Sequence, residues 1–424
     1  MKVYKFGGAS IKDADSIKNV AEIIKNNLPD EAIIIISATG KSTNALEKVV
    51  DDYFNNNGHA FDSLENVKKT HVEIIHQLFD TDSDELLAEI NDLFVDIEWI
   101  LEETANGNYD QIYDQIVCLG ELLSSKIVSA FLEKSGIQNS WLDVRDCILT
   151  DNNYRDANID WEESNKRIKK SVLSLQRKGI IITQGFLGNT SENFTTTLGR
   201  EGSDYSAAIF SFCLDAESMT IWKDVPGVLN ADPRIFKDAQ LLKEISYSEA
   251  IEMTYYGAQV IHPKTLQPLK TKKIPLYVKS FLHPNDEGTV VFEKEPKQYP
   301  PVYVVKDNQA LLNFYSKSFY FVDESKFSKL FDAFSRHKIK VNMTQNTALS
   351  FSVCVNFDER KIQTLCKELE TEYNIELLKD LKLLTLRHSD NIIVDKFSKG
   401  RKIYLEERIK GNVQLVMDSK EILD

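Results

Sequence analysis

The sequence predicts an α/β domain with a mostly parallel central sheet between helices, followed by a smaller α+β region of ferredoxin-like type. Two observations predict this fold class. The first forty residues read as strand, helix, strand, which is the grammar of an α/β domain. The last third of the chain changes to the order βαββαβ, which is the ferredoxin-like plait. A length of 424 residues agrees with two or three domains.

The N-terminal elements follow from local pattern. Val3–Phe6 reads as a strand that stops at Gly7 and Gly8, and Ile11–Leu28 has apolar residues at helical spacing. Ala32–Ile36 is an unbroken apolar run, which is typical of a strand covered on both faces. These elements therefore form a strand–helix–strand unit.

The rest of the first domain continues the alternation. Residues 44–136 are predicted to be largely helical and to form a lobe that partly covers a site. The later expected elements are strands 140–144, 179–183, 218–222 and 274–278, a helix starting at Ser203 and a helix over 246–256. Lys, Pro and Gln then cluster, so we end this domain at residue 295 and place a linker at 296–304.

Residues 305–424 form the second predicted region. Its expected elements are strand 310–315, helix 324–337, strand 339–344, strand 348–356, helix 359–373 and strand 382–387. Beyond these, 412–417 alternates as a strand should. We expect it to join a sheet as an extra strand, within one chain or between chains.

Composition excludes several classes of protein. The 65 acidic residues exceed the 51 Lys and Arg, giving a formal net charge of −14, which is unsuited to general nucleic-acid binding. The five cysteines are scattered without a CxxC pair, so neither a zinc site nor a disulfide framework is indicated. We find no signal-like start and no long apolar stretch, and we expect a cytoplasmic protein without membrane or nucleic-acid partners.

Two loops follow the first two strands. Lys5–Ser10 combines a lysine, two glycines and a serine before a helix, which suits a phosphate group, although an ordinary strand-to-helix turn explains it equally well. Ser37–Asn44 is small and polar, and its alternative explanation is a helix cap. Since ligands bind beyond the carboxyl ends of strands in open α/β sheets, both loops are expected to line one crevice.

Leu198–Ala207 is the most specific stretch. Arg200 can hold a carboxylate through two hydrogen bonds, and Asp204, near a helix N-terminus, can hold an ammonium group. The stretch thus suits a zwitterion, and its alternative is a surface loop before a capped helix. Trp222–Arg234 is rich in turn residues and suits a nucleotide loop or a plain exposed turn. His262 precedes Pro263 at the expected start of a helix, so we interpret it as structural rather than as a catalytic base.

Taken together, these motifs resemble the aspartate kinase family of the amino acid kinase fold. The resemblance covers about residues 1–295, and more loosely 305–390. The matching motifs, in the family's order, are Lys5–Ser10, Gly120–Leu122, Trp141–Arg145, Gly199–Tyr205, Asp224–Gly227 with Asp232–Arg234, and Gly257–Pro263. The C-terminal part resembles an ACT module, apparently shorter than two full modules.

The resemblance implies an activity and a set of residues. It implies transfer of a phosphate from ATP to the side-chain carboxylate of L-aspartate, with Mg²⁺ on the phosphates and no metal held by a dedicated protein site. The residues implied for the phosphates are Lys5, Gly7, Gly8 and Ser10, and those for the rest of the nucleotide are Lys223, Asp224, Leu229, Arg234 and Gln259. Those implied for aspartate are Ser37, Thr43, Glu121, Arg200, Ser203 and Asp204, with Lys5 and Asp204 as the catalytic pair.

Departures from the family pattern keep alternatives open. Gln259 stands where a phosphate-binding lysine is frequent, and either Lys223 or Lys264 is a candidate substitute. The alternatives are a catalytically impaired amino-acid sensor and a kinase for another small carboxylate or a nucleotide. The loop after the first plait strand, at 321–324, also departs from the usual effector loop. We therefore expect weak or absent inhibition by lysine or threonine. The resemblance to an ACT module implies a site for an amino-acid effector in this region. We also expect a homodimer joined through residues 305–424.

Overall fold

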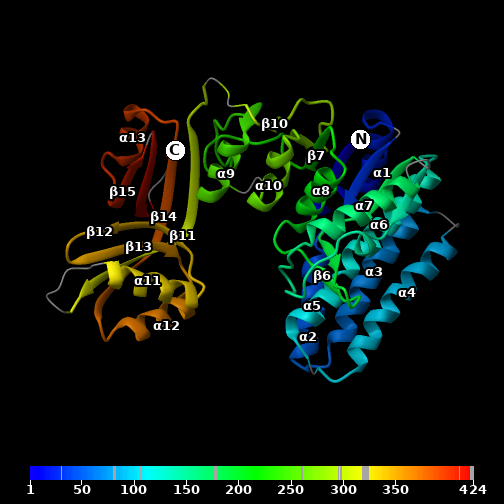
Figure 1. The fold of residues 1–424 in the computed structure, drawn as a ribbon, viewed down its shortest axis with the longest axis horizontal. Helices are drawn as coiled ribbons and strands as arrows, with labels where there is room; N and C mark the ends of the chain where they lie inside the picture. Colours follow the sequence, from blue (N-terminus) through cyan, green and yellow to red (C-terminus); the bar gives the residue numbers. More distant parts are fainter. Residues whose placement is uncertain are drawn as a thin grey trace. The chain divides into compact units, whose positions relative to one another are not determined.

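The computed structural model describes residues 1–29, 31–79, 83–105, 107–175, 179–258, 261–294, 296, 298–317, 324–409 and 411–420 (Figure 1). Contacts divide the chain into two compact units. The first contains 1–228, 241–251 and 260–295, and the second contains 229–240, 252–259 and 296–424. Two short segments that precede residue 295 thus group with the C-terminal unit.

An eight-stranded sheet forms the centre of the first unit. Its strands, in spatial order, are β3 (Asn139–Leu142), β4 (Ile180–Gln184), β2 (Ala32–Ile36), β1 (Lys2–Phe6), β7 (Ser218–Lys223), β9 (Leu276–Ser280), β10 (Thr289–Phe292) and β8 (Glu244–Ser246). The first six are mutually parallel, and β10 runs antiparallel to β9. The predicted mostly parallel sheet is therefore confirmed.

The first helix begins later than its apolar spacing suggests. A short 3₁₀ helix, η1 (Gly8–Ile11), follows β1, and α1 (Ala14–Asn27) starts only after Asp13. The side chain of Asp13 accepts a hydrogen bond from the backbone amide of Ser16 at 2.8 Å. Because this bond satisfies an amide that the helix itself leaves unpaired, Asp13 sets the start of α1.

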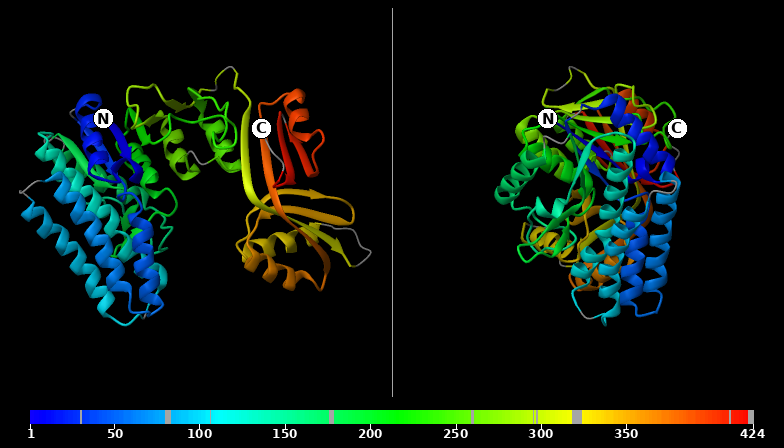
Figure 2. Two further views of the ribbon diagram at one scale, coloured as in Figure 1. Left: turned by 180° about the vertical axis from the view of Figure 1, so that it is seen from behind. Right: turned by 90° about the vertical axis from the view of Figure 1, so that its right-hand side faces the viewer.

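The expected helical lobe packs on one face of the sheet. It consists of α2 (Ser42–Phe54), α3 (Ala60–Leu78), α4 (Asp84–Glu102), α5 (Tyr109–Val117) and α6 (Leu119–Lys134), which lie side by side in blue to cyan in Figure 2. Their apolar faces join those of β1, β2 and β4 in one core. By length and composition residues 109–134 would also pass as a membrane span, but 72% of the apolar window is buried inside the protein. We interpret this segment as a core helix pair.

The remaining elements of the first unit cover the other side and its edges. Helix α8 contacts β1, β2 and β7, and both α7 and α10 pack against α8. The bounds of these elements are α7 (Trp161–Leu175), α8 (Gly202–Cys213), α10 (Pro263–Lys272), η2 (Val144–Asp146), and the two-stranded sheet β5 (Leu187–Asn189) with β6 (Thr195–Thr197). Helix α9 (Tyr247–Tyr256) begins in the first unit, and its residues from 252 onward belong to the second. The N-terminus of α8 thereby reaches the carboxyl ends of the central strands.

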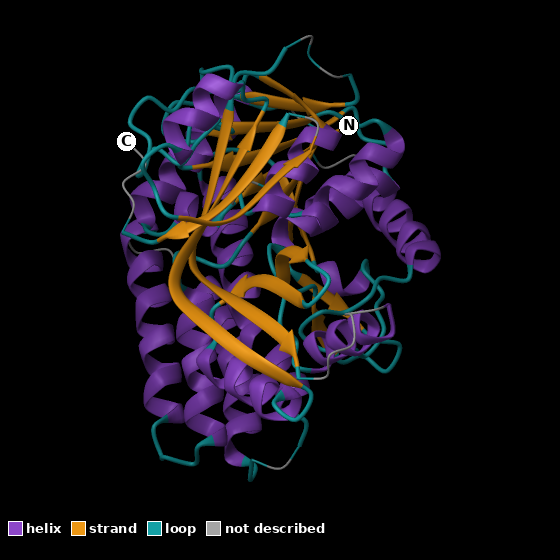
Figure 3. Ribbon diagram, turned by 90° about the vertical axis from the view of Figure 1, so that its left-hand side faces the viewer, coloured by secondary structure: helices purple, strands orange, loops and turns teal. Residues whose placement is uncertain are grey.

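The second unit is built on a six-stranded antiparallel sheet, and its long strands are seen as strongly curved orange arrows in Figure 3. Its elements in chain order are β11 (Val302–Ser316), α11 (Glu324–Arg336), β12 (Val341–Asn346), β13 (Ser350–Asn356), α12 (Glu359–Leu369), β14 (Tyr373–Arg387), α13 (Asn391–Ser398), β15 (Ile403–Ile409) and β16 (Asn412–Asp418). The order βαββαβ appears as expected over β11–β14. The extra strand is β16, which pairs with β14 of the same chain.

The two long strands β11 and β14 contribute side chains to more than one apolar core. β11 and β14 pair along their length, with register shifts at Lys306–Leu311. One half of the pair joins β12, β13, α11 and α12 in one apolar core, while the other half joins β16 and α13 in a second. Phe236 belongs to the second core, where its ring stacks on Tyr303 at 5.1 Å. The segment 229–240 is thereby packed on the C-terminal sheet.

Candidate active site

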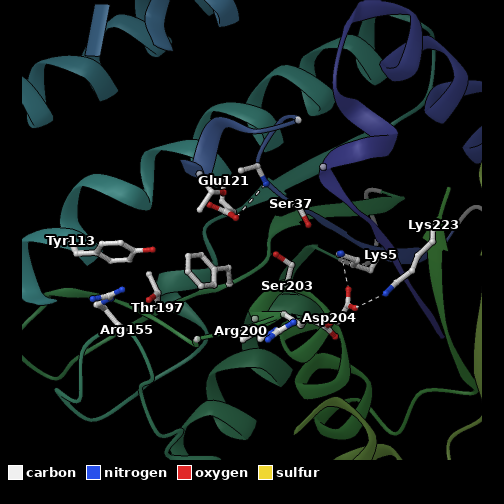
Figure 4. A pocket seen from close by; sticks show the side chains of 18 residues that line it. Lys5, Ser37, Tyr113, Glu121, Arg155, Thr197, Arg200, Ser203, Asp204 and Lys223 are labelled. Atoms are coloured by element: carbon white, nitrogen blue, oxygen red, sulfur yellow. Dashed lines mark hydrogen bonds and ion pairs between the residues drawn. The ribbon is translucent and has the colours of Figure 1, made fainter. Parts of the chain in front are cut away.

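A cavity of about 510 Å³ lies in the first unit beside the carboxyl ends of β1, β2 and β7. Its lining carries the charged side chains of Lys5, Glu121, Arg155, Arg200, Glu201, Asp204 and Lys223 (Figure 4). The parallel register explains why two lysines meet there. In this register Lys5 of β1 lies opposite Ile221 of β7, two residues before Lys223. Both lysines therefore stand near the carboxyl ends of their strands, at the same edge of the sheet.

Lys5 and Lys223 share one carboxylate. The ammonium nitrogen of Lys5 lies 2.7 Å from Oδ1 of Asp204, and that of Lys223 lies 3.7 Å from Oδ2. Burial of Asp204 acts to raise its pKa, but the two lysines outweigh it and hold the pKa below the ordinary value. Asp204 is therefore ionised, and the group carries one net positive charge at the end of the strands.

Two glycine-containing loops approach each other closely beside these lysines. A Cβ on Gly8 would lie 2.6 Å from the carbonyl oxygen of Ala38, and the amide of Gly40 donates to the carbonyl of Gly8 at 3.1 Å. Only a residue without a side chain fits this approach. The loops after β1 and β2 are therefore held together as one wall of the cavity.

Glu121 is a buried carboxylate with few hydrogen bonds to offset the loss of its contacts with water. Its Oε1 accepts a hydrogen bond from the amide of Ala38 at 3.3 Å, whereas Oε2 has no hydrogen-bond partner among the described residues. Burial raises the pKa of Glu121 to about 8, and the amides and Lys5 only partly oppose this. A buried acceptor without a donor is costly, so the site favours a ligand that brings a donor or a cation.

Arg200 stands on a tight turn before α8. Gly199 has a φ of 77°, and the amide of Gly202 donates to the carbonyl of Gly199 at 3.0 Å. The Arg200 guanidinium is exposed and, among the residues that the structure describes, has no ion pair or hydrogen bond. It is thus available for an anion in the cavity. Ser203 follows in α8 and packs closely on Gly185. A Cβ added at Gly185 would lie 2.5 Å from the Cβ of Ser203.

The structure brings most of the expected site residues together. The cavity lining includes Lys5, Gly8, Ser37, Thr43, Glu121, Arg200, Ser203, Asp204 and Lys223. Gly7 lies against the Lys5 ammonium, and the Ser10 hydroxyl donates to the carbonyl of Gly7 at 2.6 Å. Both therefore shape the loop next to the cavity.

Three other expected nucleotide residues do not line the cavity. Asp224 is in an exposed turn, and Leu229 and Arg234 belong to the second unit, where Arg234 pairs with Asp232 at 2.6 Å. Gln259 lies outside the described residues. Their expected contact with a nucleotide stays a prediction.

The two candidate substitutes for a phosphate-binding lysine differ in place. Lys223 lines the cavity, whereas Lys264 forms an ion pair with Asp156 and is not part of the lining. His262 is the N-cap of α10, and its Nδ1 accepts a hydrogen bond from the Lys264 amide at 3.2 Å. Burial lowers the pKa of His262. These contacts agree with a structural histidine.

Four lining residues carried no local sequence signal. Tyr113 reaches the cavity from α5, Thr197 from β6, and Arg155 and Phe186 from irregular segments. A tertiary contact joins three of them: buried Asp114, next to Tyr113, accepts hydrogen bonds from the amides of Arg155 and Thr197 at 3.0 and 2.9 Å. Burial raises the pKa of Asp114 to about 6 although these bonds oppose it.

Comparison with known proteins agrees with this architecture. Residues 1–280 match the amino acid kinase family. The chain is 30% identical to lysine-sensitive aspartokinase 3 of Escherichia coli over 398 residues, covering 92% of this chain and 87% of that protein. It is 31% identical to the chloroplastic bifunctional aspartokinase/homoserine dehydrogenase 2 of Arabidopsis thaliana, of which it spans 42%.

Solved structures give the same result. The crystal structure of E. coli aspartokinase III in complex with aspartate and ADP aligns with a TM-score of 0.84 and 27% identity, covering 99% of this chain and 96% of that chain. The aspartate kinase of Clostridium acetobutylicum, at 22% identity and a TM-score of 0.80, shares the fold. This chain belongs to the amino acid kinase family and, within it, to the aspartokinases.

Proposed function

We propose that this protein transfers the γ-phosphate of ATP to the side-chain carboxylate of L-aspartate, giving 4-phospho-L-aspartate, the first step towards lysine, threonine and methionine. The observation that carries the substrate assignment is Glu121, a buried carboxylate whose Oε2 lacks a donor among the described residues. An α-ammonium group supplies both the charge and the donors that this oxygen lacks. Arg200 lines the same cavity and can take the α-carboxylate. The E. coli relative was crystallised with aspartate and ADP, which supports the same pair of ligands.

The reaction needs positioning and charge neutralisation rather than a covalent enzyme intermediate. The Lys5–Asp204–Lys223 group lies at the carboxyl ends of the strands, where the ammonium groups of both lysines can stabilise phosphate oxygens. Thr43 and Ser37 line the adjacent wall and would orient the attacking carboxylate. Asp204 holds Lys5 in place and would share the ammonium group with Glu121.

Mg²⁺ fits this site as a companion of ATP. No group of three His, Cys, Asp or Glu side chains within the described ranges could hold a metal, so phosphate oxygens and water would be its main ligands. Asp204 lines the cavity beside Lys5, the lysine that we assign to the phosphates, and would face the metal through water. When bound, the metal would neutralise charge on the phosphates.

Further parts of the assignment are proposed on the resemblance. Residues 1–295 would be the catalytic domain, and Asp224, Leu229, Arg234 and Gln259 would contact the nucleotide. Residues 305–424 would form an ACT-like region that joins two chains and can take an amino-acid effector. A related aspartokinase III was crystallised with lysine and aspartate, which makes lysine the first effector to test. The protein would act in the cytoplasm.

ADP release from the full chain tests the activity. With ATP and Mg²⁺ present, L-aspartate should stimulate release, and hydroxylamine should trap an acyl hydroxamate. Glutamate, N-acetylglutamate and UMP in place of aspartate should give little turnover. A chain that binds aspartate without releasing ADP would instead be an amino-acid sensor, and one that prefers another acceptor would be a different kinase of this family.

A further inference from the structure

Glu201 has a strained backbone in a loop that lines the cavity. It lies between Arg200 and α8, with a φ of 54° and a ψ of 30°. This left-handed conformation is uncommon for residues with a side chain, whereas glycine adopts it without steric cost. Strain of this kind persists where surrounding contacts enforce it, often at ligand clamps.

The side chain of Glu201 supplies such a contact. Its Oε2 accepts a hydrogen bond from the backbone amide of His262 at 2.9 Å, although the two residues are 61 positions apart. His262 is the N-cap of α10, so this amide belongs to the positive end of a helix. A bond from such an amide to a carboxylate is stronger than one between neutral groups.

The same turn of α10 holds a second loop of the cavity. Lys264 forms an ion pair with Asp156, the neighbour of the lining residue Arg155. Asp156 in turn lies so close to the turn that a Cβ on Gly199 would come within 2.5 Å of its Oδ1. The start of α10 is therefore tied to the Arg200 turn from two sides.

Arg200 depends on this backbone for its position. Within the described part of the chain its guanidinium makes no ion pair or hydrogen bond, so its place in the cavity depends on the backbone of the turn rather than on polar contacts. Glu201 is the residue of that turn whose side chain is anchored outside it.

We propose that Glu201 is a positioning residue of the aspartate site, whose bond to the His262 amide sets the turn that presents Arg200 to the α-carboxylate of the substrate. The inference rests on the proposed function. Glu201 acts through Arg200 and has no part in the chemical step. A purely structural role would instead lower stability and leave the preference for aspartate unchanged.

Steady-state kinetics of the full chain test this role with two variants. Glu201→Gly suits the left-handed backbone but removes the bond, and it should raise the KM for aspartate about tenfold, the effect of losing one hydrogen bond to a charged group. The KM for ATP should stay within about twofold, and the thermal midpoint should change little, because the relief of backbone strain by glycine offsets the lost hydrogen bond. Glu201→Gln keeps an acceptor oxygen for the His262 amide and should stay within about threefold of wild type.

A double-mutant cycle shows whether Glu201 acts through Arg200. In an Arg200→Ala background, Glu201→Gly should add little to the KM for aspartate, because the side chain that it positions is gone. An unchanged or lower KM in Glu201→Gly, an equal rise in Glu201→Gln, or a full effect in the Arg200→Ala background would each overturn the inference while the wild type stays active. A wild type that releases no ADP with aspartate would overturn the proposed function and this inference together.

Discussion

Lys5 at the end of β1 and Asp204 in the first turn of α8 form an ion pair of 2.7 Å in which both side chains are buried. Nearly two hundred residues separate them in the chain. The pair places a fixed ammonium group where the loops after β1 and β2 meet, and Lys223 adds a second. We expect this group to act mainly on the charge of the transferred phosphate.

Replacing Lys5 tests that expectation. Lys5→Met keeps most of the apolar stem but removes the charge, and it should lower kcat more than it raises the KM for ATP, because the charge matters most in the transition state. A loss of about 100-fold or more in kcat is expected for one electrostatic group. Lys5→Arg, the matched control, should retain part of the activity. A change in the KM for ATP alone would show that Lys5 only anchors the nucleotide.

Glu121 should make aspartate binding depend on pH. Its pKa of about 8 means that in the substrate-free protein the carboxyl is largely protonated at neutral pH. The substrate ammonium favours the ionised form, so binding releases a proton, and the KM for aspartate should fall as the pH rises from about 6.5 to 8. Calorimetry of aspartate binding in buffers of different ionisation enthalpy measures the released proton directly.

The raised pKa of Glu121 also makes the stability of the substrate-free protein depend on pH, and here a rising pH is unfavourable. Ionising buried Glu121 is unfavourable, so its contribution to stability is present below the unfolded pKa and is lost as the pH rises towards 8. Glu121→Gln cannot ionise and serves as the control. It should abolish the proton release, raise the KM for aspartate and remove this part of the pH dependence. Proton release that persists in Glu121→Gln would place the titrating group elsewhere.

Arg200 is predicted to recognise the α-carboxylate. Arg200→Ala should cost about 3 kcal/mol, or roughly 100-fold in kcat/KM for aspartate, by analogy with breaking a buried charge pair. The KM for ATP should barely change. Arg200→Lys keeps the charge but loses the planar fork, so an intermediate loss is expected. Aspartate kinetics like those of the wild type in Arg200→Ala would refute the assignment.

The second unit should join two chains. Light scattering of the full protein at micromolar concentration should give twice the chain mass of 48.5 kDa. Leu349, Ile392 and Ile409 are large apolar side chains that are 55–78% exposed within residues 305–424. At least one Lys substitution among them should weaken the dimer, because a buried unpaired charge is costly. Trp99→Lys, at a 64% exposed position in the helical lobe, is the control. A monomeric wild type would contradict the prediction.

Inhibition is a separate expectation. The segment 321–324 departs from the usual effector loop, and residues 321–323 of it lie outside the described part of the chain. We expect lysine and threonine to inhibit weakly or not at all. Titration of the activity with each amino acid measures this, and strong cooperative inhibition by either would show that the altered loop still serves an effector.

Local sequence determined the elements and much of the site in this protein. The apolar run at 32–36 became a fully buried strand of the parallel sheet, since only burial on both faces suits such a run. Lys5, Arg200 and Asp204 stand in motifs whose residue types and glycines already imply anion and cation recognition, and the structure collects them in one cavity. The order βαββαβ likewise followed from periodicity.

Tertiary structure decided what periodicity cannot express. The start of α1 moved to Ala14 because a single cap, Asp13, outweighs the apolar spacing. Segment 229–240 packs with the C-terminal unit, since Phe236 finds its apolar partners there. Glu121 acquires its raised pKa, and Glu201 its strained backbone and distant anchor, only when residues far apart in the chain are brought together. Burial and long-range hydrogen bonds depend on the whole fold, so no local pattern contains them.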